Sequence, residues 1–264
     1  MKYKRIIKFI EKLAKKLNIF YKKRSNVKLL IKNKSKHNKK FDPVTNLDKI
    51  FERFIRQEIS KNFSNHSIIG EELKDLKKDV LNKWSIDPID GTKAFIIGSP
   101  TWSNLVSFSE LNRSLFGLAN FPDLNKYYVN NEKKSFVVTN NKKIQLKTSK
   151  TFNLKKTKII GNFHGTISHK KQQKIIKKFG WSFRLASYDA LNYCLLAEGK
   201  VDAVVEAGLK PYDILPLIPI IENSGGIVTT WEDQSAENGG KILASANLTL
   251  HKRIIRLLKP FSSK

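Results

Sequence analysis

Six acidic residues are the side chains of this sequence best suited to chemistry, because they follow predicted strands or precede predicted helices. They are Asp48, the pair Glu71 and Glu72, the pair Asp87 and Asp90, and Asp213. Clustered carboxylates raise each other's pKa values, so a fold that gathers them needs a cation to neutralise them. With one cysteine and five histidines in the chain, the ligands are almost all oxygen, which favours Mg²⁺, allows Mn²⁺ or Ca²⁺, and disfavours Zn²⁺.

Residues 87–92, with the sequence DPIDGT, form the most informative segment. The proline restrains its own backbone and the aspartate before it, so both carboxylates and the carbonyl of Ile89 can face one point. Gly91 permits close approach of the backbone, and its amide and that of Thr92 could face an anion if a helix starts there. The segment therefore predicts a metal site beside a phosphate cradle. Taken alone, it could also be a capped turn.

The elements that would position these residues fall into two groups. The first comprises a predicted helix over 3–21, a second helix that follows the turn-like segment 42–48 and carries Ile50, Phe54, Ile55 and Ile59 on one side, and strands over 66–73, 83–86, 101–109, 115–121 and 127–130. The second comprises strands over 157–162, 201–206, 227–231 and 242–244 and helices over 169–179, 189–198, 214–223 and 248–258. We therefore expect an α+β half with an antiparallel sheet over residues 1–150 and an α/β half over 151–264, with the site in the cleft between them.

Four ordered motifs resemble those of the inositol monophosphatase-like family of metal-dependent phosphomonoesterases. They are DPVT at 42–45 with Asp48, IGEE at 69–72, WSIDPIDGT at 84–92, and Tyr212–Asp213 followed by 221–226. The resemblance covers about residues 40–250 and implies the layered αβαβα sandwich that this family shares with fructose-1,6-bisphosphatases. The sequence around 93–102 and 204–213 most resembles the bacterial histidinol-phosphate phosphatase branch.

This resemblance implies a role for each acidic motif. It implies two or three Mg²⁺ ions, or Mn²⁺, held by Glu71, Asp87, Asp90, Asp213 and the carbonyl of Ile89. It assigns Thr92 and Asp48 to orienting and deprotonating the attacking water, and Glu72 to a position behind the metals or to a further metal contact. Gly91 and Thr92 would hold the phosphoryl oxygens. The implied reaction is in-line hydrolysis of L-histidinol phosphate in histidine synthesis, without a covalent intermediate.

Acidic residues on the second half would recognise the alcohol part of the substrate. Asp189 and Glu206 align with the family's recognition positions, and carboxylates there favour the amine and imidazole of histidinol over a neutral polyol. Asp189 could instead be only a helix N-cap, and Glu206 could hydrogen-bond inositol hydroxyls. Arg184 either neutralises phosphate or pairs with Asp189. We interpret His164 as a surface histidine and Cys194 as a core residue. Inositol-1-phosphate and 3′-phosphoadenosine 5′-phosphate remain alternative substrates.

The formal net charge of +27 suggests a different class, a basic nucleic-acid-binding protein on a degenerate phosphatase scaffold. The excess lies in residues 1–40, with 16 basic and 1 acidic side chains, and in residues 121–183, with 15 and 2. All four motifs lie outside these segments, every expected metal ligand is present, and the basic residues are mostly lysine. We therefore expect a solvated lysine-rich surface and no nucleic-acid partner.

Partners and location follow from weaker signals. The chain contains no run of about 18 uncharged apolar residues, so we expect no membrane span or secretory signal, and a cytoplasmic location. Residues 3–21 could contact an anionic membrane, but packing on their own domain is the favoured interpretation. Family analogy alone predicts a homodimer and a small phosphate monoester as the substrate.

Overall fold

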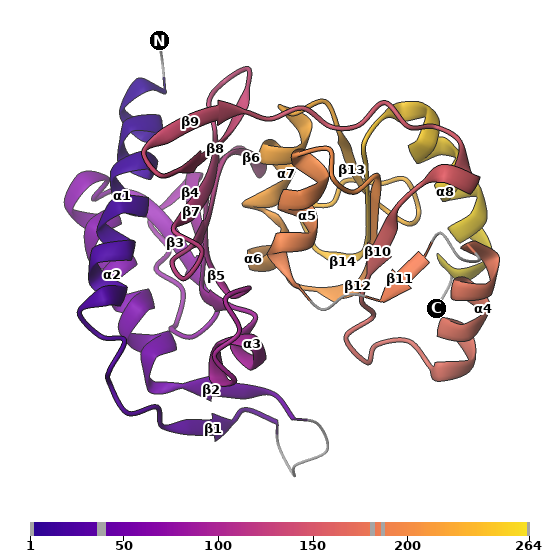
Figure 1. Ribbon diagram of the computed structural model, residues 1–264. Coiled ribbons are helices and arrows are strands. Elements are labelled where there is room, and N and C mark those ends of the chain that lie inside the picture. The colour runs from indigo at the N-terminus through magenta and orange to yellow at the C-terminus, as the bar shows by residue number, and fades with distance from the viewer. Residues whose placement is uncertain (1–2, 36–40, 180–182, 186–187, 263–264) are drawn as a thin grey trace.

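The computed structural model describes residues 3–35, 41–179, 183–185 and 188–262 and has five alternating layers of helices and sheets (Figure 1). Two helices cover the outer face of a seven-stranded sheet, three lie between this sheet and a five-stranded sheet, and two cover the far face. The longer helices are α1 (Lys4–Lys22), α2 (Asn46–Asn62), α4 (His169–Phe179), α5 (Ala190–Ala197) and α8 (Leu248–Ser262); the shorter ones are α3 (Thr92–Ile96), α6 (Pro211–Ile214), α7 (Leu217–Glu222) and the 3₁₀ turn η2 (Leu154–Lys156). The expected αβαβα order is confirmed.

The seven-stranded sheet carries the first acidic motifs. Its strands, in spatial order, are β3 (His66–Gly70), β4 (Asp79–Asp90), β5 (Ser103–Glu110), β6 (Arg113–Phe121), β7 (Lys126–Asn130), β8 (Ser135–Thr139) and β9 (Lys142–Gln145). The expected antiparallel meander is confirmed from β4 onward, whereas β3 pairs parallel to β4. Because both strands of a parallel pair end at the same edge, the IGEE and DPIDGT motifs meet there. The N–H of Glu71 donates to the carbonyl of Ile86 at 3.1 Å.

The five-stranded sheet is mixed. Its order is β11 (Phe183–Leu185), β10 (Ile159–Gly161), β12 (Ala203–Leu209), β14 (Gly240–Ser245) and β13 (Ile227–Thr230). Strand β10 runs parallel to β11 and β12, and β14 runs antiparallel to its two neighbours. A separate pair, β1 (Ile31–Asn33) with β2 (Pro43–Thr45), was not predicted from the sequence. Neither was the β8–β9 hairpin.

Apolar faces of the helices fix the layers. In α1, Ile10, Leu13 and Leu17 are buried under a lysine-bearing outer face, so the apolar side of this helix packs on the protein itself, as favoured from the sequence. A second core cluster joins β5–β8 to the middle helices and includes the fully buried Cys194, which confirms it as a core residue. The two sheets therefore share the middle layer, and the cleft between them rests on packed helices.

The helix predicted over 214–223 is wrong in detail. The chain forms α6, turns at Leu215, and starts α7 after Pro216, which occupies the N-cap position. Pro216 and Pro219 each lack an N–H, and a proline ring clashes with the preceding helical turn, so an uninterrupted helix cannot run through both. The break leaves Asp213 on a short helix that ends beside the cleft.

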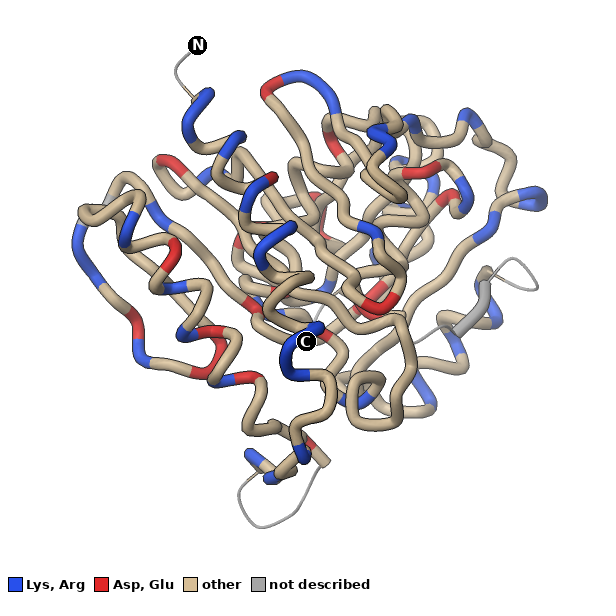
Figure 2. Tube along the Cα trace, turned by 60° about the vertical axis from the view of Figure 1, so that its left-hand side comes forward, with Lys and Arg blue, Asp and Glu red and all other residues tan. Residues whose placement is uncertain are grey.

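Lysine and arginine positions are spread over the outer segments of the protein, as Figure 2 shows for one side of the molecule. The longest helices carry many of them, including α1 and α4. In the described part of the chain, no helix is long and apolar enough to cross a membrane.

Candidate active site

The DPIDGT segment is the end of strand β4 rather than an isolated turn. Its pairing with β5 shifts register between Asp87 and Asp90, so both side chains reach the same side of the sheet edge. The buried Asn104 on β5 donates from Nδ2 to the carbonyl of Pro88 at 2.7 Å, and the N–H of Ile89 donates to Asp87 Oδ1 at 3.1 Å. These bonds hold the backbone of Pro88 and Ile89, the two residues between the aspartates.

Gly91 ends the strand and allows α3 to start at Thr92, as expected. Its φ is +75°, and a Cβ at this position would lie 2.8 Å from Asp189 Oδ2, so only glycine fits here. The hydroxyl of Thr92 donates to the carbonyl of Ile89 at 3.1 Å. Gly91 and Thr92 therefore form a tight corner between the acidic end of β4 and the second half of the protein.

Three carboxylates from distant parts of the sequence meet at this corner. Asp87, Asp90 and Asp213 each offer an oxygen, and the three oxygens lie within 4.8 Å of one another. Asp213 is held in place by the N–H of Lys210, which donates to its Oδ2 at 2.6 Å. Asp90 Oδ2 accepts from the Ser103 hydroxyl at 3.2 Å and from the N–H of Ala190 at 3.0 Å. The site is thus assembled across both sheets.

Burial and mutual repulsion raise the pKa values of this cluster. The pKa of Asp87 lies well above its ordinary value, first because of burial and then because of Glu71. The pKa of Asp90 is raised in the same way by burial and by Asp189. Burial raises the pKa of Asp213 to about 7, with Glu71 adding to the increase. Without a cation, these groups therefore favour protonation near neutral pH.

Glu71 and Glu72 are held beside the cluster by a second set of contacts. Glu52 on α2 is fully buried and accepts from the N–H of Glu72 at 2.7 Å, while Arg56 donates from Nε to Glu52 at 2.7 Å. Lys34, just after β1, places its ammonium 2.8 Å from Glu71 Oε1 and also contacts Glu72. Burial raises the pKa of Glu72 to about 7 even with this lysine beside it.

Asp48 lies in the first turn of α2 and is fully buried. Its Oδ2 accepts from the N–H of Thr45 at 2.7 Å and from the Thr45 hydroxyl at 2.6 Å, which forms half of a capping box. Its Oδ1 has no hydrogen-bond partner among the described residues. Burial raises the pKa of Asp48, and Glu71 raises it further.

The corner opens into a cavity of about 800 Å³ between the two halves. The opposite wall carries Glu206, whose carboxylate accepts from Asn192 Nδ2 at 2.9 Å and from the Tyr193 hydroxyl at 3.1 Å. His164 lies beside it, with Nε2 3.8 Å from Glu206 Oε2. Asp189, at the start of α5, lies between this wall and the corner, since a Cβ on Gly91 would lie 2.8 Å from its Oδ2. The wall with Asp87, Asp90 and Asp213 can therefore hold a cation and a phosphate. The wall with Glu206 and His164 also carries a carboxylate and faces the same cavity.

Comparisons with known proteins agree with this arrangement. The sequence profile of the inositol monophosphatase family matches residues 2–262. The chain belongs to the inositol monophosphatase family. It is accordingly a phosphoric monoester hydrolase, as the family resemblance predicted.

Individual relatives carry several names. The bifunctional phosphatase IMPL2 of Arabidopsis thaliana is 32% identical over 73% of this chain, which spans 58% of that protein's length. A histidinol-phosphatase of Mycobacterium tuberculosis is 27% identical, covering 82% of this chain and 84% of its own. A fructose-1,6-bisphosphatase/inositol-1-monophosphatase of Aquifex aeolicus is 28% identical, covering 83% of both. The structure of an inositol monophosphatase from Zymomonas mobilis superposes with a TM-score of 0.80 at 25% identity, covering 98% of this chain and 99% of that one.

Nine of the site residues expected from the family motifs line the one cavity. They are Glu71, Asp87, Ile89, Asp90, Gly91, Thr92, Asp189, Glu206 and Asp213. Asp48 and Glu72 lie behind this wall, where both feel the charge of Glu71 and Lys34. Arg184 lies on β11, and its side chain falls outside the described part of the structure.

Two expectations about Asp189 and His164 need correction. Asp189 occupies the N-cap position of α5, but its side chain makes no capping hydrogen bond, and its φ of +46° turns it away from that role. The first amide of α5 instead donates to Asp90. His164 is not a surface histidine, since it lines the cavity and contacts Glu206.

Lys34 and Glu52 were missed in the sequence. Lys34 belongs to a lysine-rich segment in which no spacing distinguishes it, and Glu52 reads as one more polar position of an amphipathic helix. The structure links Glu52 to the IGEE motif, because a Cβ on Gly70 would lie 2.0 Å from its Oε1. The glycine of the IGEE motif therefore leaves room for the carboxylate that holds Glu72.

The donor set fits a hard divalent cation. Three convergent carboxylates, a nearby fourth at Glu71 and the carbonyl of Ile89 supply only oxygen, which suits Mg²⁺. The buried Asp48 Oδ1 and the raised pKa values of the cluster are the physical signs of a cation requirement. The residues present are therefore complete for the group that the family implies.

Proposed function

We propose that the protein is a Mg²⁺-dependent phosphomonoesterase whose substrate is L-histidinol phosphate, which would place it in histidine synthesis. The observation that carries the proposal is the convergence of Asp87, Asp90 and Asp213 opposite an acidic wall in one cavity. Bound Mg²⁺ supplies neutralisation of the carboxylates, activation of water as a nucleophile, and stabilisation of charge on the phosphoryl and leaving oxygens.

The protein's own residues supply positioning and proton transfer. In this proposal, Glu71, Asp87, Asp90, Asp213 and the carbonyl of Ile89 hold the cations. Thr92 and Asp48 orient the attacking water, and the unpartnered Oδ1 of Asp48 accepts its proton. The amides of Gly91 and Thr92 hold the phosphoryl oxygens at the corner where α3 begins.

Asp189 is the residue that favours a cationic leaving group. Glu206 already accepts two hydrogen bonds and faces His164, whereas no described side chain donates a hydrogen bond to Asp189. Asp189 feels the charges of His164 and Lys93, but a carboxylate without a hydrogen-bond donor can form an ion pair with an amine, which a neutral hydroxyl cannot form. The relatives named histidinol-phosphatase support this substrate, although relatives of similar identity have other names.

A phosphate-release assay tests the proposal with histidinol phosphate, inositol-1-phosphate and 3′-phosphoadenosine 5′-phosphate, each with and without Mg²⁺. We expect Mg²⁺-dependent release with the highest kcat/KM for histidinol phosphate. Preference for either alternative would overturn the substrate, and no release from any of the three would overturn the enzymatic proposal.

Asp189→Asn sharpens the same assay, since it removes a charge and keeps the shape. We expect KM for histidinol phosphate to rise about tenfold, which corresponds to about 1.4 kcal/mol, while KM for inositol-1-phosphate changes little. An equal change for both substrates would assign Asp189 to general cavity shape.

The family analogy also leads us to propose a homodimer, which a monomeric mass in sedimentation equilibrium would exclude.

A further inference from the structure

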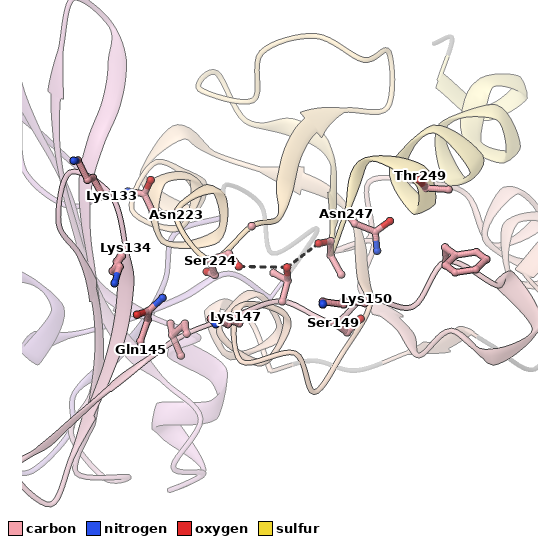
Figure 3. A pocket seen from close by; sticks show the side chains of 15 residues that line it. Lys133, Lys134, Gln145, Lys147, Ser149, Lys150, Asn223, Ser224, Asn247 and Thr249 are labelled. Atoms are coloured by element: carbon pink, nitrogen blue, oxygen red, sulfur yellow. Dashed lines mark hydrogen bonds between the residues drawn. The ribbon is translucent and has the colours of Figure 1, made fainter.

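A second cavity of about 650 Å³ lies where the chain crosses from the seven-stranded to the five-stranded sheet. Four lysines line it, Lys133, Lys134, Lys147 and Lys150, together with Asn223 and Asn247 (Figure 3). We call it the lysine cavity. It shares no lining residue with the candidate active site, so it is a separate feature of the protein.

The segments that carry these lysines are fixed to the second half by hydrogen bonds. Asn223 Nδ2 donates to the carbonyl of Asn131 at 2.9 Å, which holds the turn that carries Lys133 and Lys134. Asn247 Nδ2 donates to the carbonyl of Thr151 at 2.9 Å, one residue after Lys150. The four side chains therefore project from anchored backbone, and their arrangement does not depend on a free loop.

Thr148 forms hydrogen bonds with carbonyl oxygens that would otherwise repel an anion. Its hydroxyl donates to the carbonyl of Ala246 at 2.7 Å and lies 3.3 Å from the carbonyl of Ser224, as the dashed lines in Figure 3 show. Its N–H also donates to the carbonyl of Ser224 at 3.0 Å. The carbonyl oxygens of two lining residues, Ser224 and Ala246, thus already accept hydrogen bonds.

No acidic side chain among the described residues pairs with the lysines of the lysine cavity. No aspartate or glutamate lines it, and none of its four lysines forms an ion pair with a residue in the described part of the chain. The lysines of α1 and β9 differ, since Lys16 pairs with Glu58 and Lys143 pairs with Glu11. Four unpaired ammonium groups around one hollow repel one another, and a multivalent anion would relieve this repulsion.

We propose that the lysine cavity is a second anion-binding site, which takes a small molecule bearing two or more phosphate groups. All four lysines are exposed, so a contact with any one of them contributes little, and a ligand must engage several at once to bind. A ligand with several phosphate groups can contact the lysines of both segments at once. The volume is that of a small-molecule site.

Calorimetric titration with inorganic triphosphate in EDTA tests this proposal, because EDTA removes the divalent cation through which the candidate active site would bind a phosphate group. We expect the double variant Lys147→Ala/Lys150→Ala to weaken binding by about tenfold or more. The matched control is Lys12→Ala/Lys15→Ala on α1, which removes the same charge from exposed helix positions and should leave the Kd within about twofold. Equal loss in both variants, or in neither, would overturn the proposal.

Protection of lysines from acetylation, read by mass spectrometry, locates the ligand independently of the variants. Triphosphate should protect Lys133, Lys134, Lys147 and Lys150 and leave the lysines of α1 reactive. A single-stranded RNA oligonucleotide provides the opposing arm. If RNA binds more tightly than triphosphate and protects the α1 lysines as well, the basic surface serves a polymer, and the assignment to a small molecule is wrong.

Discussion

The candidate active site and the lysine cavity gather like charges in opposite ways. The acidic groups of the active site are largely buried, and burial raises the pKa values of Asp87, Asp90 and Asp213. The lysines of the cavity are exposed, and water screens their repulsion. Buried like charges destabilise a fold unless a ligand neutralises them, whereas exposed ones cost little. A bound cation therefore stabilises the acidic cluster, whereas the lysine cavity keeps its charge in water at little cost and is organised by its anchored backbone.

The largest expected effect comes from removing one buried carboxylate. Asp90→Asn keeps the shape and the bonds from Ser103 and Ala190 but removes a charge that holds the cation. We expect kcat to fall by about 1,000-fold or more while the circular dichroism spectrum stays unchanged. The matched control is Asp75→Asn, the same substitution at an exposed position, which should retain full activity. Full activity in Asp90→Asn would refute the metal-ligand assignment.

A smaller effect should appear in the stability of the protein without metal. In the folded state the pKa of Asp213 is about 7, above its pKa in the unfolded chain. At any pH between these two pKa values, the folded protein therefore binds more protons than the unfolded chain. Stability in EDTA should therefore decrease as pH rises from about 4 through about 7. Each pKa unit is worth about 1.4 kcal/mol before screening, so we expect the Tm in EDTA to drop by several degrees between pH 5.5 and pH 8.

Added Mg²⁺ and one substitution test whether the carboxylates of the active site cause this pH dependence of the Tm. Added Mg²⁺ should raise the Tm more at pH 8 than at pH 5.5, because it neutralises the ionised carboxylates. Asp213→Asn should flatten the profile in EDTA, since it removes one titrating group, whereas Lys147→Ala/Lys150→Ala should leave the profile as in the wild type. An unchanged profile in Asp213→Asn would show that other groups dominate the titration.

The acidic site could be predicted from the sequence because its motifs are short and lie at strand ends. Residues 87–92 fix their own local geometry through a proline and a glycine, and parallel pairing of β3 with β4 brings Glu71 to the same edge. Asp213 could be singled out as an acidic residue before a predicted helix, but only the family motif grouped it with Asp87 and Asp90, because no local pattern shows that α6 reaches β4. The layer order was likewise predictable from strand and helix alternation together with that resemblance.

The missed features depend on contacts between distant segments. His164 faces Glu206 because strands β10 and β12 are neighbours. Nothing in the sequence around His164 indicates that these two strands pair. The lysine cavity combines segments about 100 residues apart, Lys147 and Lys150 with Asn247, in a chain where lysine is the most frequent charged residue. The division of the chain at residue 150 stays a prediction, since a shared core cluster joins the two sheets.

The smallest expected effect concerns the basic surface as a whole. A net charge of +27 should attract a phosphorylated anion toward the cleft, and added salt should weaken this attraction. We expect kcat/KM to fall about threefold between low and physiological ionic strength, with kcat nearly unchanged, because steering affects encounter and not the chemical step. Lys147→Ala/Lys150→Ala should keep most of this salt dependence, since it removes two of many distributed charges. If that variant abolished the salt dependence, the lysine cavity itself would steer the substrate, and the two sites would be separate in space but linked in function.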